Sequence, residues 1–154
     1  MADIVALQRR FDIPGVAQII AGEGGLPAIE VFGPAARGRV YLHGAHVASF
    51  IPEGGPGRGR ESLWLSAKSH WKAAMPIRGG IPICFPWFGP RKDDTAAPPH
   101  GFARLMEWEL EAITRETGEA NGGVTVQLVL RSGPETTARW PHAFLLRYRV
   151  DDQI

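Results

Sequence analysis

Cysteine is almost absent from this sequence, which has one, Cys84, among 154 residues. A single cysteine excludes an intrachain disulfide, and its free thiol fits a reducing compartment such as the cytoplasm. An excess of charge of one sign is also lacking, because 17 basic and 16 acidic side chains leave a net charge of +1. No general electrostatic field would therefore attract nucleic acid or an anionic membrane. We expect a cytoplasmic protein with no nucleic-acid partner and no membrane partner.

Long apolar runs and the usual cofactor motifs are missing as well. No apolar run is long enough to cross a bilayer, and no basic-then-apolar segment resembles a signal peptide. The sequence contains no glycine-rich phosphate loop, no paired-cysteine motif and no zinc-protease motif. Four histidines, His43, His46, His70 and His142, have no partners at metal-ligand spacing, so we interpret them as structural or surface residues. We predict neither a metal nor a cofactor.

Glycine and proline are plentiful, at 19 and 13 residues, as expected for many turns between short strands. Several segments alternate apolar and polar residues with a period of two and are rich in β-branched and aromatic side chains, which is typical of half-buried strands. We expect strands at residues 16–20, 26–32, 38–43, 46–51, 62–66, 106–113, 124–130 and 144–150. The pattern predicts an all-β sandwich.

The segments between these strands are expected to be mainly turns and loops. Asn121-Gly122 is a strong hairpin signal, and residues 132–141 are expected to form a loop. Residues 1–10 suit a short helix or a frayed end, and residues 68–75 suit one helical turn.

Residues 77–90 contain a single charge, Arg78, among glycine, proline and large apolar side chains. The pair Gly79-Gly80 permits positive φ or a close approach of the backbone to a ligand. Three prolines in this stretch exclude a regular strand or helix. We interpret the stretch as a rigid loop that holds one guanidinium for bidentate contact with a phosphate or carboxylate. The alternative is that Arg78 pairs with a carboxylate of the protein and that the loop, with Cys84 as a buried inert thiol, fills the core.

His100 and Arg104 form a second candidate group, four residues apart across a glycine. Together with Arg78 they would offer one imidazole and two guanidinium groups, which suit an anionic polar ligand. The alternative is that His100 hydrogen-bonds a backbone carbonyl. Trp87 and Phe88, beside the arginine loop, are candidates for stacking on a sugar ring, although most aromatic side chains pack in the core.

Residues 77–89, followed by His100-Gly101-Phe102-Ala103-Arg104, resemble the hexose-6-phosphate mutarotases. These are the glucose-6-phosphate 1-epimerases of the aldose 1-epimerase, or galactose mutarotase-like, superfamily. Shorter matches lie at residues 44–50, 63–66, 107–108 and 140–144, in the family's order.

The resemblance implies a galactose mutarotase-like β-sandwich (supersandwich) and an isomerase that interconverts the α and β anomers of hexose 6-phosphates by acid–base ring opening, without a cofactor. It implies that Arg78, His100 and Arg104 bind the substrate. A residue that is often glutamine in the family is Pro99 here, so that contact is not carried over.

Enzymes of this family are longer, and their general acid and general base lie beyond the point where this sequence stops. We therefore expect residues 1–154 to be the N-terminal part of a single mutarotase-like domain, with no catalytic residue of its own and no activity alone. A non-catalytic sugar-phosphate binding or regulatory module remains the alternative. An incomplete sandwich would leave the strand at residues 144–150 with an exposed edge, through which the chain could self-associate.

Overall fold

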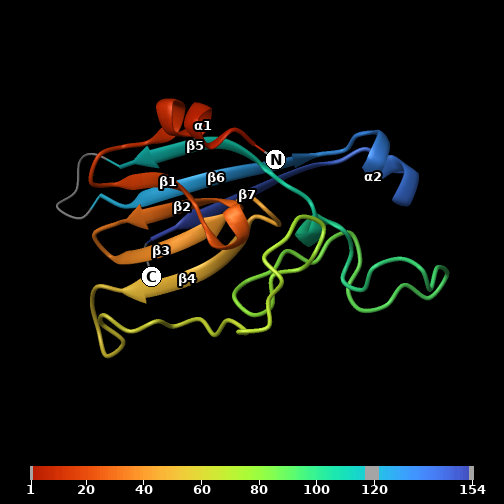
Figure 1. Ribbon diagram of the computed structural model, residues 1–154, viewed down its shortest axis with the longest axis horizontal. Helices are drawn as coiled ribbons and strands as arrows, with labels where there is room; N and C mark the ends of the chain where they lie inside the picture. The colour runs from red at the N-terminus through yellow and green to blue at the C-terminus, as the bar shows by residue number, and fades with distance from the viewer. Residues whose placement is uncertain (1, 117–121, 153–154) are drawn as a thin grey trace.

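The computed structural model describes residues 2–116 and 122–152, which form two antiparallel β-sheets (Figure 1). The first sheet has the order β1-β2-β3-β4 and contains β1 (Ala17–Ala21), β2 (Pro27–Phe32), β3 (Ala36–Tyr41) and β4 (His46–Pro52). The second has the order β5-β6-β7 and contains β5 (Glu109–Arg115), β6 (Val124–Arg131) and β7 (Leu145–Asp151). The remaining elements are the helices α1 (Ile4–Phe11) and α2 (Pro134–Arg139) and the 3-10 turns η1 (Glu23–Gly25) and η2 (Ala103–Leu105). The predicted all-β fold is confirmed.

The two sheets pack face to face around one apolar core. Inward-facing side chains of the first sheet, such as Ile19 and Ile29, belong to the same buried cluster as Leu110 and Leu128 of the second. Each such side chain contributes about 1.5–3 kcal/mol when it leaves water. Trp108 is 2% exposed, and its indole N–H donates to the Ala103 carbonyl at 2.9 Å. This bond ties η2, which carries Arg104, to the core.

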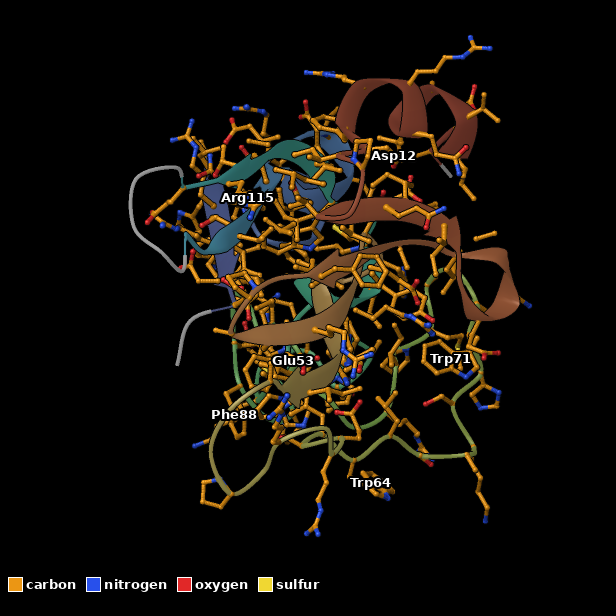
Figure 2. The ribbon with its side chains drawn as sticks, turned by 90° about the vertical axis from the view of Figure 1, so that its left-hand side faces the viewer. Asp12, Glu53, Trp64, Trp71, Phe88 and Arg115 are labelled. Atoms are coloured by element: carbon orange, nitrogen blue, oxygen red, sulfur yellow. The ribbon has the colours of Figure 1, made fainter. Side chains whose placement is uncertain are left out.

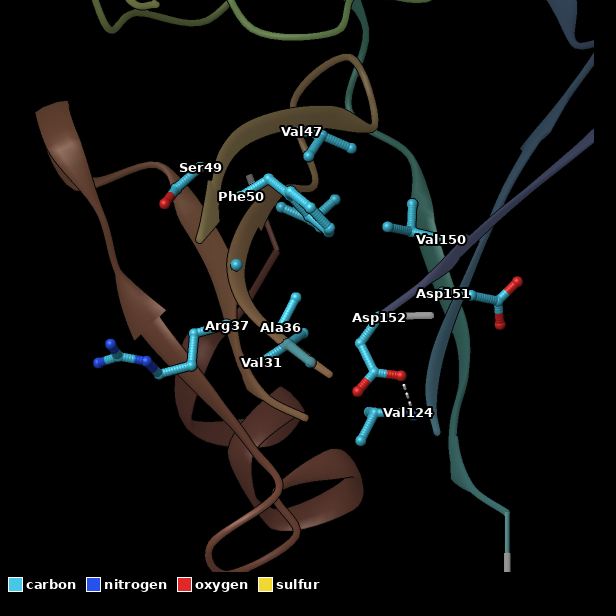
Figure 3. A pocket seen from close by; sticks show the side chains of 12 residues that line it. Val31, Ala36, Arg37, Val47, Ser49, Phe50, Val124, Val150, Asp151 and Asp152 are labelled. Atoms are coloured by element: carbon cyan, nitrogen blue, oxygen red, sulfur yellow. Dashed lines mark hydrogen bonds between the residues drawn. The ribbon is translucent and has the colours of Figure 1, made fainter. Parts of the chain in front are cut away.

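A cavity of about 20 Å³ lies between the sheets, beside β3, β4 and β7 (Figure 3). Its lining is mainly apolar, and its volume holds about one water molecule. Asp152 lies beside it and accepts hydrogen bonds from the N–H groups of Val124, at 2.7 Å, and Ala35, at 3.4 Å. The carboxylate thereby links the end of the second sheet to the turn between β2 and β3. The cavity is a packing gap and has no room for a sugar.

The structure differs from the sequence prediction in the segment that follows β4. Residues 62–66 form no regular strand, because only Leu65 makes a bridge, with Gly79. Residues 68–75 contain turns but no helix. This segment packs on the outer face of the first sheet, where Trp71 lies against Tyr41 with ring centroids 5.1 Å apart. Side-chain packing and isolated backbone bonds, which leave no periodic pattern in the sequence, hold this segment in place.

A second difference is α2, because residues 132–141 were expected to be a loop. Pro134 occupies the first turn, where its missing N–H is not needed. The Gly133 N–H donates to Thr136 Oγ1 at 2.8 Å and caps the start of the helix. A helix of six residues is too short to show a 3.6-residue period in the sequence. Cys84 is partly exposed and was expected to be buried.

Three sequence predictions remain untested. The Asn121-Gly122 turn lies partly outside the described residues, although β5 and β6 do pair as antiparallel neighbours. β7 lies at an edge of its sheet, and Leu145 at its start is 45% exposed. Association through that edge stays a prediction, as does the assignment of residues 1–154 to one part of a longer domain. No helix among the described residues is long and apolar enough to cross a membrane.

The segment between β4 and η2 is almost entirely irregular and forms the loops of the candidate site. Figure 1 shows it running past β4 toward a group of loops at one end of the sheets. The Ile81 N–H donates to the Val47 carbonyl at 2.9 Å, and the Gly80 N–H donates to the Trp64 carbonyl at 2.9 Å. The first bond fixes the arginine loop to the start of β4, and the second fixes it to the segment that follows β4.

Candidate functional site

The backbone around Arg78 is held from both sides. Its N–H donates to Ser69 Oγ at 3.0 Å, and its carbonyl accepts from the Ser66 N–H at 2.9 Å. Gly79 has φ of +95°, and a Cβ there would lie 2.2 Å from the Trp64 carbonyl oxygen, so only glycine fits. The exposed side chain of Arg78 therefore extends from a fixed backbone.

Arg78 forms no ion pair within residues 2–116 and 122–152. The alternative expectation, that it pairs with a carboxylate of the protein, therefore finds no support in the described part of the chain. A guanidinium on a rigid backbone without a protein partner is available to an external anion.

The His100-Arg104 segment is locked by unusual backbone angles. His100 has φ of +64°, rare for a residue with a side chain, and Gly101 follows with φ of +72°. A Cβ on Gly101 would lie 2.0 Å from the Phe85 carbonyl oxygen, which accepts from the Phe102 N–H at 2.9 Å. The surrounding loop thus holds His100 in a conformation that an isolated chain would rarely adopt.

Hydrogen bonds fix both functional side chains of this segment. The Gly89 N–H donates to His100 Nδ1 at 3.1 Å, so the neutral imidazole carries its proton on Nε2. The partner is a backbone N–H and not the carbonyl of the alternative expectation. Arg104 Nη2 donates to the Pro99 carbonyl at 2.7 Å, while Arg104 Nε is buried without a partner among the described residues.

Arg78, His100 and Arg104 line one open pocket with a volume of about 690 Å³. This volume falls within the range of small-molecule sites. Residues 76–79, 98–100 and 104–105 supply most of the lining, which includes no carboxylate. The sequence prediction that these three residues lie together is confirmed, whereas their role in binding stays a prediction.

The two aromatic candidates for sugar stacking are placed differently. Trp87 lines a separate pocket, where its indole N–H donates to the Pro98 carbonyl at 3.0 Å and its ring lies 5.1 Å from the Arg91 guanidinium carbon. Phe88 is 80% exposed, and its ring lies 4.7 Å from that of His100, edge to face. Phe88 is therefore the better placed of the two, at the edge of the arginine pocket.

Trp64 lines the pocket and was not singled out from the sequence. Its side chain is 73% exposed and projects from the molecule (Figure 2). Leu63 and Leu65 line a different pocket, on the side of the first sheet, so alternate residues of this extended segment face opposite ways. That alternation was visible in the sequence and could have identified Trp64 as the outward residue.

Two buried histidines lie behind the arginine loop. His43 Nε2 and the Met75 carbonyl oxygen are 2.8 Å apart. His46 is 1% exposed, and burial lowers its pKa to about 4, with smaller contributions from the charges of His43 and Arg104. His46 is therefore neutral at physiological pH. Within the described ranges, no three His, Cys, Asp or Glu side chains gather closely enough to hold a metal ion.

Comparison with known proteins agrees with this architecture. The family profile described as Aldose 1-epimerase matches residues 33–152. A curated protein from Salmonella typhimurium named "Putative glucose-6-phosphate 1-epimerase" is 40% identical over 127 residues, which cover 81% of this chain and 40% of that protein. A protein of the same name from Escherichia coli is 38% identical over 121 residues, covering 79% of this chain and 38% of its own.

A solved structure shows the same relationship. The structure titled "Crystal Structure of a putative mutarotase (YeaD) from Salmonella typhimurium in monoclinic form" superposes with a TM-score of 0.79 at 35% identity, covering 92% of this chain and 44% of that one. The chain thus spans about two fifths of the length of the curated relatives that it matches.

Proposed function

Because this chain belongs to the aldose 1-epimerase family, we propose that it forms part of an enzyme that interconverts the α and β anomers of a hexose 6-phosphate. The pocket lined by Arg78, His100 and Arg104 would bind the substrate. One observation carries the proposal: the two guanidinium groups line the same pocket, and neither forms an ion pair with a carboxylate of the described residues.

The phosphate would be bound mainly by the two arginines. A charge-assisted hydrogen bond contributes about 1.5–3 kcal/mol, so a bidentate contact from Arg78 and a further bond from Arg104 would supply micromolar to millimolar affinity. The Pro99 carbonyl already orients the Arg104 guanidinium. Less ordering of that side chain is then needed on binding.

The sugar would lie over the rest of the pocket. His100 has its neutral-ring proton on Nε2, so this imidazole suits a hydrogen bond to a sugar hydroxyl. The exposed indole of Trp64 and the ring of Phe88 offer apolar faces at the edge. An apolar face beside hydroxyl-binding groups matches the chemistry of a pyranose ring.

Ring opening requires a base that removes the proton of the C1 hydroxyl and an acid that protonates the ring oxygen. The lining residues include no carboxylate, and His100 is the single imidazole among them, whereas ring opening needs both an acid and a base. We therefore infer that this pocket binds the substrate and that the acid–base pair comes from elsewhere in the enzyme. A cytoplasmic location, where sugar phosphates and free thiols are expected, belongs to the same proposal.

Calorimetric titration with D-glucose 6-phosphate tests the proposal. We expect saturable binding by the unaltered chain and at least tenfold weaker binding by Arg78→Ala, with an unchanged unfolding midpoint. Arg60→Ala, in the exposed loop after β4, removes the same charge away from the pocket and should leave the affinity unchanged. Equal affinities of the Arg78 and Arg60 variants would show that Arg78 does not contact the ligand.

A further inference from the structure

The second half of the arginine loop is bonded to the segment that carries His100 and Arg104. The Phe85 carbonyl accepts from the Phe102 N–H at 2.9 Å. Four residues later in the loop, the Gly89 carbonyl accepts from the His100 N–H at 2.8 Å. Two backbone contacts thus hold the two segments together at separate points.

The side chain of Trp87 adds a third contact between the same two segments. Its indole N–H donates to the Pro98 carbonyl at 3.0 Å, and its ring meets that of Phe102 edge to face, with centroids 5.9 Å apart. Trp87 does not line the arginine pocket, whereas Pro98 does. The indole therefore acts on the wall of this pocket from outside.

The position of the Pro98 carbonyl largely determines that of the next carbonyl. Between the two carbonyls lie a planar peptide, the φ of Pro99, which its ring fixes, and the ψ of Pro99. The two hydrogen bonds between His100 and Gly89 restrict this remaining angle. The Pro99 carbonyl in turn accepts from Arg104 Nη2 at 2.7 Å, the one hydrogen bond of this guanidinium within residues 2–116 and 122–152.

Trp87 is itself held by Arg91. The guanidinium carbon of Arg91 lies 5.1 Å from the centroid of the Trp87 ring. Arg91 Nη1 donates to the Arg139 carbonyl at the end of α2, at 2.9 Å, and Nε donates to Asp93 at 2.8 Å. The indole is therefore fixed against a group that is anchored to a helix.

We propose that Trp87 is a positioning residue for the arginine pocket and not a surface for sugar stacking. Its indole N–H holds the Pro98 carbonyl, and the adjoining Pro99 carbonyl orients the Arg104 guanidinium. A guanidinium that is already oriented loses less freedom when it binds an anion. Trp87 thereby favours a phosphorylated sugar over an unphosphorylated one without touching either.

The link from Trp87 to Arg104 does not depend on a ligand, whereas its effect on affinity rests on the proposed function. Trp87→Phe removes the indole N–H and keeps an aromatic ring. Trp140→Phe is the matched control, because Trp140 also packs on the loop, 5.3 Å from the Phe85 ring, and its indole N–H bonds no described residue. Arg91→Lys keeps the charge but loses the planar group that lies over Trp87.

The first measurement is the nitrogen NMR spectrum of the Arg104 guanidinium in the free chain at low temperature. We expect separate signals for the two Nη groups in the unaltered chain and in Trp140→Phe, because the bond to Pro99 hinders rotation, and averaged signals in Trp87→Phe. Averaged signals in the unaltered chain, or separate signals in Trp87→Phe, would overturn the proposal. If Trp87→Phe does not fold, Arg91→Lys decides by the same signals, with averaging expected.

The second measurement is the affinity for D-glucose 6-phosphate and for D-glucose. Trp87→Phe should bind the phosphorylated sugar about fivefold more weakly and D-glucose with little change, because Arg104 must then be ordered on binding. Trp140→Phe should bind both sugars like the unaltered chain. Equal losses for both sugars in Trp87→Phe, or none, would refute its role in binding and leave the proposed function intact. Absence of binding by the unaltered chain would count against the proposed function, while the Arg104 signals would still decide the link to Trp87.

Discussion

Acid should destabilise this protein through His46. The unfolded chain has an ordinary histidine pKa of 6.5, whereas burial lowers the pKa of His46 to about 4 in the folded state. As the pH falls below 6.5, the unfolded state binds the proton first and is stabilised relative to the folded state. The stability that neutral His46 provides is therefore complete above pH 6.5 and is lost progressively down to about pH 4. At 1.36 kcal/mol per pH unit, the loss reaches about 2 kcal/mol at pH 5 and about 3 kcal/mol below pH 4.

Urea unfolding at pH 7 and pH 5 measures this effect, because most carboxylates titrate below that range. The positive charges that face a protonated His46 come from Arg104 and from a charged form of the neighbouring His43. We expect the unaltered chain to lose about 2 kcal/mol more between the two pH values than the variant His46→Leu, which cannot bind this proton. Equal losses in the two proteins would show that His46 is not held neutral by burial, and the reasoning about its ring would fail.

Three further predictions concern the pocket. Arg104→Ala should weaken binding of D-glucose 6-phosphate at least tenfold but change binding of D-glucose little, whereas His100→Ala should weaken binding of both sugars. Calorimetry measures these affinities, and equal losses for both sugars in both variants would refute this division of roles. Gly80→Ala should destabilise the chain by at least 1–2 kcal/mol in urea unfolding, because φ is +58° and a Cβ would lie 2.4 Å from the Val47 carbonyl oxygen; an unchanged midpoint would refute it. The chain alone should not accelerate the exchange between the two anomers of D-glucose 6-phosphate, which NMR can follow. A rate above the spontaneous one would reveal an acid–base pair among the chain's own residues.

The strands were largely predictable because their signal is local. Residues 26–32 and 124–130 are rich in β-branched and other apolar side chains, and β2 and β6, in which most residues are buried, lie there within one residue at each end. The short helix α2 was missed because it depends on the capping contact between Gly133 and Thr136. A six-residue segment leaves too little periodicity for such a helix to be recognised from the sequence.

The candidate site was only partly predictable. Arg78 and Arg104 stand out in the sequence because each is a charge within a glycine-rich motif, and the structure brings both to one pocket. Trp64 was missed because aromatic side chains were expected to pack mostly in the core, although the alternation of residues 63–65 placed it on the outward side. The environment of His46 depends on contacts between residues distant in sequence, so no local pattern could indicate its burial.

Saturation-transfer NMR on an equimolar mixture of D-glucose 6-phosphate and D-glucose tests the central claim most directly. The account predicts saturation transfer to the phosphorylated sugar that inorganic phosphate competes away and that the double variant Arg78→Ala/Arg104→Ala abolishes. Equal transfer to both sugars that persists in the double variant would contradict the claim that these two arginines form a sugar-phosphate site.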